Sequence, residues 1–128
     1  MKAVLLDTHT LLWWLEGSDR LSTKAREVIQ DPITRVLVSV GSLWEIAIKH
    51  QLGKLKAPNL INNFQKELDD AGFIELPIFG RHAIGAAVLP AKHRDPFDRL
   101  FISQAQIESV PIVSRDSKFD DYGIDRIW

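Results

Sequence analysis

Short runs of apolar residues alternate along the chain with longer segments in which apolar residues recur at a helical period. The short runs are rich in Val, Leu and Ile, which is typical of buried strands. They predict strands at residues 3–6, 36–40, 74–76, 111–114 and 124–128, the last with the weakest pattern. The longer segments predict helices at residues 8–15, 22–30, 42–52, 60–71, 80–89 and 96–109.

Capping signals support several of these helix starts. Ser22 and Ser42 are expected as N-terminal caps, Asn59 can cap the helix at 60–71, and Asp95 followed by Pro96 is a typical helix start. Strands that alternate with helices imply a parallel sheet covered on both faces. The predicted fold is therefore a three-layer α/β/α sandwich with a mostly parallel central sheet of about five strands.

Composition narrows the class of protein. The chain has 128 residues with 45% hydrophobic content, which predicts a single domain over residues 1–128. Sixteen Lys and Arg against 17 Asp and Glu give a net charge of −1, so a uniformly basic coat for nucleic acid is excluded. The absence of cysteine excludes disulfides and thiolate sites. No apolar run is long enough for a membrane span, and the start of the chain does not resemble a secretion signal, so a cytoplasmic location is expected.

Four acidic residues stand at matching places in this topology. Asp7 directly follows the first predicted strand, and Asp116 closely follows the strand at 111–114. Glu45 lies one turn into the helix after the second strand, and Asp98 lies in the first turn of the helix at 96–109. In parallel sheets, ligands bind beyond the carboxyl ends of the strands. Two carboxylates 4 Å apart repel by about 4 kcal/mol at an effective dielectric of 20, so a cluster of four must either protonate some of its members or bind a cation. Oxygen ligands suit Mg²⁺ or Mn²⁺.

Each acid also has a simpler interpretation. Asp7 could cap the helix that begins beside it, and Glu45 could be a solvated helix residue. Asp98 could belong to a capping arrangement with Asp95, and Asp116 could close the turn after its strand. The metal hypothesis therefore depends on the four acids as a set.

Four stretches of the chain carry a family resemblance. They are LLDTHTLLWW at 5–14, VSVGSLWEIAIK at 38–49, HRDPFDR at 93–99 and SRD at 114–116. In this order they resemble the PIN-domain ribonucleases, specifically the VapC-type toxins of VapBC toxin–antitoxin systems. The resemblance spans nearly the whole chain, with Gly41 and Ser114 as small departures from residues that are usually alanine and threonine.

The resemblance implies a Mg²⁺- or Mn²⁺-dependent endoribonuclease. It places the metal ligands and catalytic acids on the residues that the topology also selects: Asp7, Glu45, Asp98 and Asp116. In such a site the metal lowers the pKa of a bound water and neutralises charge on the phosphate. Asp116 would orient the attacking water or support a second ion. Thr8 matches a hydroxyl position near the metal.

Several further residues are candidates for substrate contact. Arg99 and Arg115 adjoin proposed ligands, Lys49 lies in a stretch without acids, and His93 flanks an acidic motif. Each could instead be an ordinary surface, ion-pairing or hydrogen-bonding residue. Thr8 is also predicted to contact the substrate.

The expected partners follow from the apolar segment at 11–15 and from the resemblance. The five large apolar residues of this segment are more than one helix face can bury, which suggests an apolar groove beside the active site. The resemblance implies that a VapB-type antitoxin fills this groove and silences a toxin that otherwise inhibits translation and growth. It also implies a homodimer, a larger hetero-oligomer with the antitoxin, and DNA contact only through the antitoxin.

Two alternative functions remain open. The chain could be a catalytically silent PIN-like scaffold, or a receiver-like signalling module. Receiver domains need paired acids after the first strand, where this chain has Asp7, Thr8 and His9, so that alternative fits poorly. DNA cleavage by the same chemistry also remains open, since no motif reads a 2′-hydroxyl.

Overall fold

The computed structural model describes residues 2–128 and contains one five-stranded sheet in which all strand pairs are parallel. The strands lie in the order β3-β2-β1-β4-β5, so the first strand in sequence is the central one. Their bounds are β1 Lys2–Leu6, β2 Thr34–Ser39, β3 Ile74–Leu76, β4 Ile112–Val113 and β5 Arg126–Ile127. The predicted parallel sheet of about five strands is confirmed.

Six α-helices and one 3₁₀ helix connect the strands. Their bounds are α1 Thr8–Glu16, α2 Thr23–Gln30, α3 Val40–Gln51, α4 Pro58–Ala71, α5 Gly80–Ala87, α6 Pro96–Glu108 and η1 Ser117–Tyr122. All six predicted helices are present, whereas η1 was not predicted. In residues 2–128, none of these helices has the length and apolar character needed to cross a membrane.

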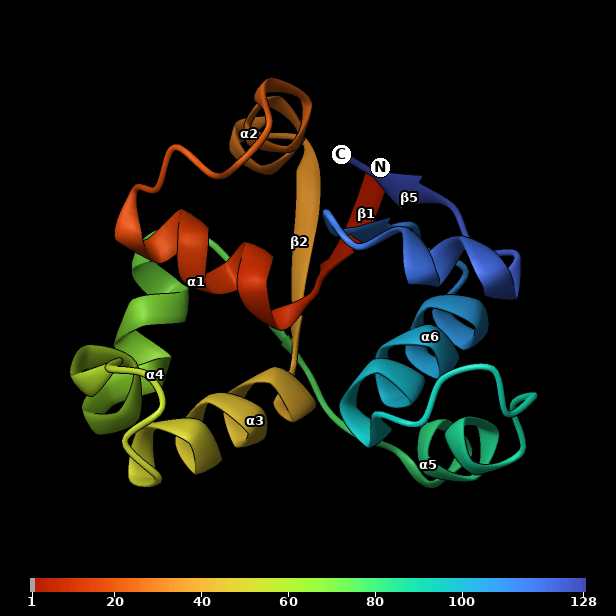
Figure 1. Ribbon diagram of the computed structural model, residues 1–128. Coiled ribbons are helices and arrows are strands. Elements are labelled where there is room, and N and C mark those ends of the chain that lie inside the picture. The colour runs from red at the N-terminus through yellow and green to blue at the C-terminus, as the bar shows by residue number, and fades with distance from the viewer. Residues whose placement is uncertain (1) are drawn as a thin grey trace.

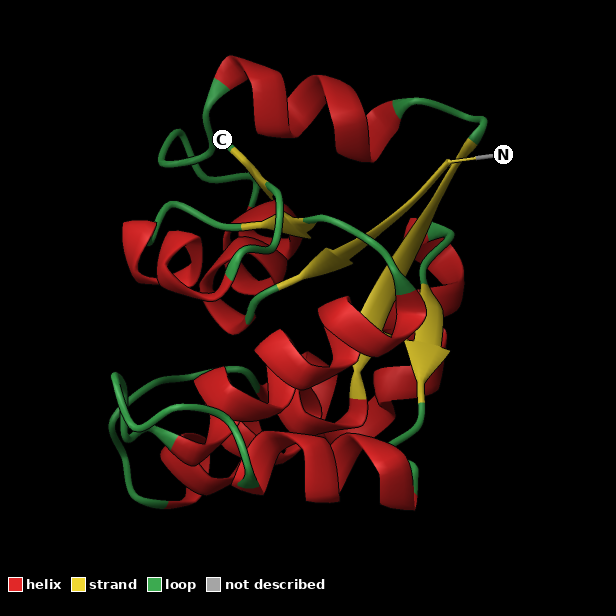
Figure 2. Ribbon diagram, turned by 90° about the vertical axis from the view of Figure 1, so that its right-hand side faces the viewer, coloured by secondary structure: helices red, strands yellow, loops and turns green. Residues whose placement is uncertain are grey.

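The helices form a layer on each face of the sheet (Figure 1). Side chains alternate along β1: Val4 and Leu6 pack with α1, α2 and α4, while Leu5 packs with α6 and η1 on the other face. All three side chains are fully buried. Figure 2 shows the strands in the interior with the helices around them, which is the predicted three-layer arrangement.

Two helix starts differ from the sequence prediction. Helix α3 begins at Val40, where the Ser39 hydroxyl accepts a 3.0 Å hydrogen bond from the Gly41 N–H, so Ser42 is not its cap. Helix α4 begins at Pro58, and no side chain caps it, so Asn59 was also wrongly predicted as a cap. In α4, proline at the first helical position replaces the cap, because it has no N–H to satisfy. The predicted caps of α2 and α6 are confirmed.

Gly41 lets the start of α3 approach α6 closely. A Cβ atom at this position would lie 2.6 Å from Cδ2 of Leu100 and 3.3 Å from Cε1 of Phe101, both on α6. Glycine therefore permits a helix approach that brings Glu45 on α3 toward Asp98 on α6.

The connection between α5 and α6 is held by one side chain. The Arg99 guanidinium donates hydrogen bonds to the backbone carbonyls of Ala87, Leu89, Pro90 and His93, at 3.3, 2.8, 3.1 and 3.0 Å. Hydrogen bonds from a charged donor are stronger than neutral ones. Arg99 thus fixes a segment that has no regular secondary structure of its own.

We expect Arg99→Gln to lower the free energy of unfolding by about 2 kcal/mol, because glutamine cannot reach all four carbonyls. Urea denaturation measures the change. Arg115→Gln is the matched control: Arg115 is exposed and its side chain has no hydrogen bond or ion pair within residues 2–128. Equal stability of the two variants would contradict the role assigned to Arg99.

Candidate functional site

Asp7 stands where β1 ends, and both of its carboxylate oxygens are hydrogen-bonded. Oδ1 accepts from the Thr10 N–H at 2.9 Å, which caps α1, and Oδ2 accepts from the Ser114 hydroxyl at 2.6 Å. The simpler interpretation of Asp7 as a cap is therefore confirmed. It does not exclude a second role, because a carboxylate has about four acceptor sites.

Glu45 is a buried residue rather than a solvated one, with 8% of its surface exposed. Its Oε1 accepts from the Thr8 hydroxyl at 2.5 Å, and its Oε2 pairs with the Lys49 ammonium at 2.7 Å. Thr8 Oγ1 also lies 3.2 Å from Oγ of Ser42. A hydroxyl carries one proton, so Thr8 donates to Glu45 and accepts from Ser42.

Asp98 and Asp116 share one cation, the ammonium group of Lys118. Lys118 Nζ lies 2.5 Å from Oδ2 of Asp98 and 3.0 Å from Oδ2 of Asp116. The Asp116 side chain also accepts a hydrogen bond from the Lys118 N–H at 3.1 Å and so caps the N-terminus of η1. Its predicted role in the turn after the strand is therefore confirmed. The sequence analysis did not identify Lys118. A lysine two residues after Asp116 was the only signal in the sequence.

The pKa values of these groups reflect burial and mutual charge. Burial raises the pKa of Asp98, the nearby charges of Asp95 and Glu45 raise it further, and Lys118 only partly opposes them. Partial burial pushes the pKa of Asp116 upward, but hydrogen bonds from Lys118 outweigh this and leave it below its usual value. Burial alone would lower the pKa of Lys118, but its hydrogen bonds to the two aspartates raise it, so Lys118 is protonated.

The four predicted acids lie at one end of the sheet but do not form a ready-made ligand set. Asp7 and Asp116 line the same cavity of about 320 Å³, Asp116 and Asp98 share Lys118, and Glu45 is close enough to Asp98 to raise its pKa. Across residues 2–128, no three acidic or histidine side chains are grouped closely enough to hold a metal ion.

The chemistry of the donors nevertheless suits a hard divalent cation. The available donors are carboxylate and hydroxyl oxygens, which Mg²⁺ and Mn²⁺ prefer. The ammonium group of Lys118 is a positive charge held between two of the carboxylates, so a cation is already favoured at this point. Three of the four carboxylates are served by ammonium groups that also occupy carboxylate oxygens, Lys49 on Glu45 and Lys118 on Asp98 and Asp116, while the guanidinium of Arg115 lies at the cavity of Asp7 and Asp116.

The predicted substrate-contact residues differ in how available they are. Lys49 is paired with Glu45, and His93 Nε2 lies 2.9 Å from Oδ2 of Asp121. The guanidinium of Arg99 is engaged with four carbonyls, so we assign it to the fold and give it no part in the site. Arg115 lies exposed at the cavity that Asp7 and Asp116 line.

Two serines contribute to the site in ways that the sequence did not indicate. Ser114 is fully buried and orients Asp7, while its Oγ also accepts from the Asp116 N–H at 3.0 Å. It therefore connects two of the predicted acids. Ser42 was predicted as a helix cap, but it is buried and its hydroxyl is hydrogen-bonded to the Thr8 hydroxyl that contacts Glu45.

Solved structures share this fold at low sequence identity. A chain of VapBC2 from Rickettsia felis, bound to a DNA fragment from its promoter, matches with a TM-score of 0.68 and 15% identity over 97% of this chain and 96% of that one. A chain of FitAcB from Neisseria gonorrhoeae matches with a TM-score of 0.63 and 16% identity, covering 96% of this chain and 95% of that one. A toxin–antitoxin complex from Klebsiella pneumoniae gives 0.62 and 15%, with 90% and 88% covered.

Comparison by sequence gives the family directly. No curated protein matches the chain significantly. The family model described as PIN domain, however, matches residues 4–125, which include all four acids, Lys118 and every strand except β5 and the first two residues of β1. This chain belongs to the PIN domain family.

Proposed function

We infer that this protein is a Mg²⁺- or Mn²⁺-dependent endoribonuclease and the toxin of a toxin–antitoxin pair. PIN domains are generally nucleases, and those nucleases typically use divalent metals. The observation that supports the proposal is that Asp7, Glu45, Asp98 and Asp116, from four separate segments, lie at one end of the sheet, linked by a shared cavity, a shared lysine and the effect of Glu45 on Asp98.

In this proposal the four acids hold the cation, directly or through water. The cation would supply Lewis-acid chemistry, neutralising charge on the phosphate and lowering the pKa of a bound water. Ser114 and Thr8 hold the carboxylates of Asp7 and Glu45 in fixed orientations through their hydroxyl groups. Asp116 is the most accessible of the four acids, with 49% of its side chain exposed, so it is placed to orient the attacking water.

The proposed reaction is hydrolysis of a phosphodiester bond of RNA that leaves a 5′-phosphate and a 3′-hydroxyl. Arg115, exposed beside Asp7 and Asp116, is available to bind a phosphate. Thr8 and Lys49 act on Glu45, and His93 lies close enough to Asp116 to lower its pKa. We therefore propose that these three residues, which the sequence predicted as substrate contacts, act on the acids by hydrogen bonding or by their charge.

Asp98→Asn should abolish metal-dependent cleavage of RNA, because the variant removes a carboxylate from the proposed ligand set and keeps the side-chain shape. Incubation of purified protein with total RNA, with and without Mg²⁺ or Mn²⁺, followed by mapping of the cut ends, measures this. Asp19→Asn is the matched control, since Asp19 is exposed and does not line the cavity of Asp7 and Asp116. Metal-dependent cleavage that survives in Asp98→Asn would defeat the proposal.

Lys118 would compete with the cation for Asp98 and Asp116. Both need the same two carboxylate oxygens, so the ammonium group must move before these oxygens can bind a metal ion. In this view Lys118 stabilises the metal-free protein and limits its affinity for metal.

We expect Lys118→Met to bind Mn²⁺ about tenfold more tightly than the unaltered protein, because two carboxylates lose their internal counter-ion. Isothermal titration calorimetry measures the affinity without any RNA. Lys24→Met is the control, because Lys24 is exposed on α2 and has no ion pair within the described residues. Unchanged or weaker Mn²⁺ binding by Lys118→Met would show that the lysine does not compete.

The proposed partner is an antitoxin of the VapB type. Leu11 is buried in the core, and the four residues that follow it pack against the same core from partly exposed positions. Leu12 and Leu15 line a cavity of about 170 Å³ together with Pro58 and Leu60 of α4. We propose that an apolar segment of the antitoxin binds there. A homodimer, a larger assembly with the antitoxin and DNA contact through the antitoxin complete the proposal.

Leu15→Asp should disrupt the complex with the antitoxin, because it places a charge beside Leu12, Pro58 and Leu60, the apolar part of the cavity lining. Co-expression with the product of the preceding gene, followed by affinity purification, measures the complex. Ile33→Asp is the control: Ile33 is 69% exposed and does not line the cavity. A purified protein that is a monodisperse monomer with no co-purifying gene product would count against this partner.

A further inference from the structure

Three aromatic rings, two of which form a stack, end beside the acidic site. Trp128 and Trp13 have ring centroids 5.9 Å apart with planes tilted by 54°, and His9 stacks on Trp13 at 5.6 Å with an angle of 22° between the planes. Trp13 and Trp128 pack against the hydrophobic core, whereas His9 is exposed and is not among the residues packed against that core. His9 is therefore the exposed end of the stack.

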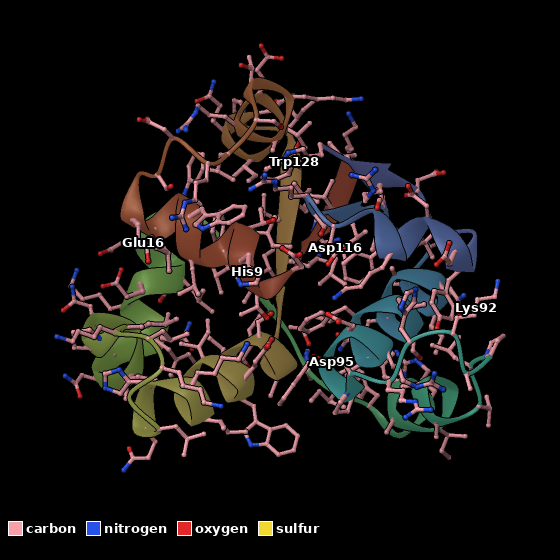
Figure 3. All side chains as sticks on the ribbon, viewed as in Figure 1. His9, Glu16, Lys92, Asp95, Asp116 and Trp128 are labelled. Carbon is pink, nitrogen blue, oxygen red and sulfur yellow. The ribbon has the colours of Figure 1, made fainter. Side chains whose placement is uncertain are left out.

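The cavity at this end joins the stack to the acids. The cavity of about 320 Å³ that Asp7 and Asp116 line has four other lining residues, which are His9, Trp13, Arg115 and Ser117. Figure 3 shows His9 and Asp116 next to each other near the centre of the view. One wall thus offers a ring face, and the same cavity contains a guanidinium and two acids of the proposed catalytic set.

His9 has no evident structural task. The other three histidines each have a hydrogen-bonding partner: His50 accepts from the Ala57 N–H, His82 contacts Glu108, and His93 contacts Asp121. Within residues 2–128, His9 has neither a hydrogen bond nor an ion pair. An exposed ring with unused polar atoms, held in place by a rigid indole, is suited to a ligand.

We propose that this cavity binds one unpaired nucleobase of the RNA, stacked on the exposed face of His9, with the adjoining phosphate bound by Arg115. The proposal rests on the ribonuclease function above and adds a base-binding subsite to it. Proteins bind bases of single-stranded RNA by stacking them on aromatic or histidine rings, and arginine binds the neighbouring phosphates.

This subsite determines the class of RNA that the enzyme accepts. A base can stack on His9 only when it has left the base stack of its own strand, so single-stranded regions and loops fit whereas continuous double helix does not. Stacking alone tolerates every base. The planar side chain of a protein partner could occupy the same ring face, but the phosphate of a nucleotide also pairs with Arg115, so this combination of ring and guanidinium favours RNA.

Binding of a fluorescently labelled, single-stranded oligoribonucleotide tests the subsite. Fluorescence anisotropy is measured with Mg²⁺ present in an Asp98→Asn background, which keeps the RNA intact and leaves every lining residue of the cavity unchanged. The compared proteins carry His9, His9→Leu, which has a similar apolar bulk without a ring, or His9→Phe, which restores a ring. A second series of oligonucleotides carries one abasic residue, moved along the strand.

We expect His9→Leu to weaken binding about tenfold and His9→Phe to restore it, because stacking needs a planar ring. One abasic position should weaken binding to the His9 protein by a similar factor, with little further loss in His9→Leu. Arg115→Ala should also weaken binding. Its control is Arg35→Ala, which removes the same charge near the amino end of β2, away from the acids.

Equal affinity of the His9 and His9→Leu proteins would overturn the subsite, as would abasic losses of the same size in both. Loss of antitoxin binding in His9→Leu, with oligonucleotide affinity kept, would assign the ring to a protein partner instead. Cleavage assays with Asp98 intact separate the two levels of the argument. If the unaltered protein cuts RNA and His9→Leu cuts it with the same KM and kcat, only the base subsite fails. If the unaltered protein neither binds nor cuts RNA, both proposals fail.

Discussion

Repulsion among carboxylates that are partly removed from water is the constraint that the contacts around the four acids must offset. Two such charges 4 Å apart cost about 4 kcal/mol at an effective dielectric of 20, and four acids lie at one end of this sheet. Lysine ammonium groups, serine and threonine hydroxyls and the N-terminus of α1 each offset part of that cost. Burial, together with the nearby charges of Asp95 and Glu45, still holds the pKa of Asp98 above its usual value.

The sequence predicts the location of the acids because parallel strands have a common end. Asp7 and Asp116 follow β1 and β4, which pair directly, so reading the strand ends was enough to place them together. The apolar runs of β1 and β3 also gave strand positions close to those observed. Residues at such positions are predictable because the sheet topology, rather than any individual side-chain contact, determines where they lie.

Contacts between side chains of separate elements could not be predicted in this way. Lys118 lies in a 3₁₀ helix without a strong sequence signal, and it reaches Asp98 on a different helix. Ser39 and Ser42 are both suited to cap α3, and only the observed position of the helix start distinguishes them. Arg99 adjoins an acid in sequence, but its guanidinium turns toward backbone carbonyls that the sequence cannot place. In each case the partner is determined by packing between elements.

The two hydrogen bonds of Asp7 have an evolutionary consequence. Asparagine caps helices as well as aspartate does, so Asn at this position would keep the bond to the Thr10 N–H while losing the negative charge. Aspartate and asparagine codons differ by a single base. Under the proposed nuclease function, a folded form of this protein without cleavage activity is therefore one point mutation away. Such a form would give a lineage a simple route from an enzyme to a pure binding protein.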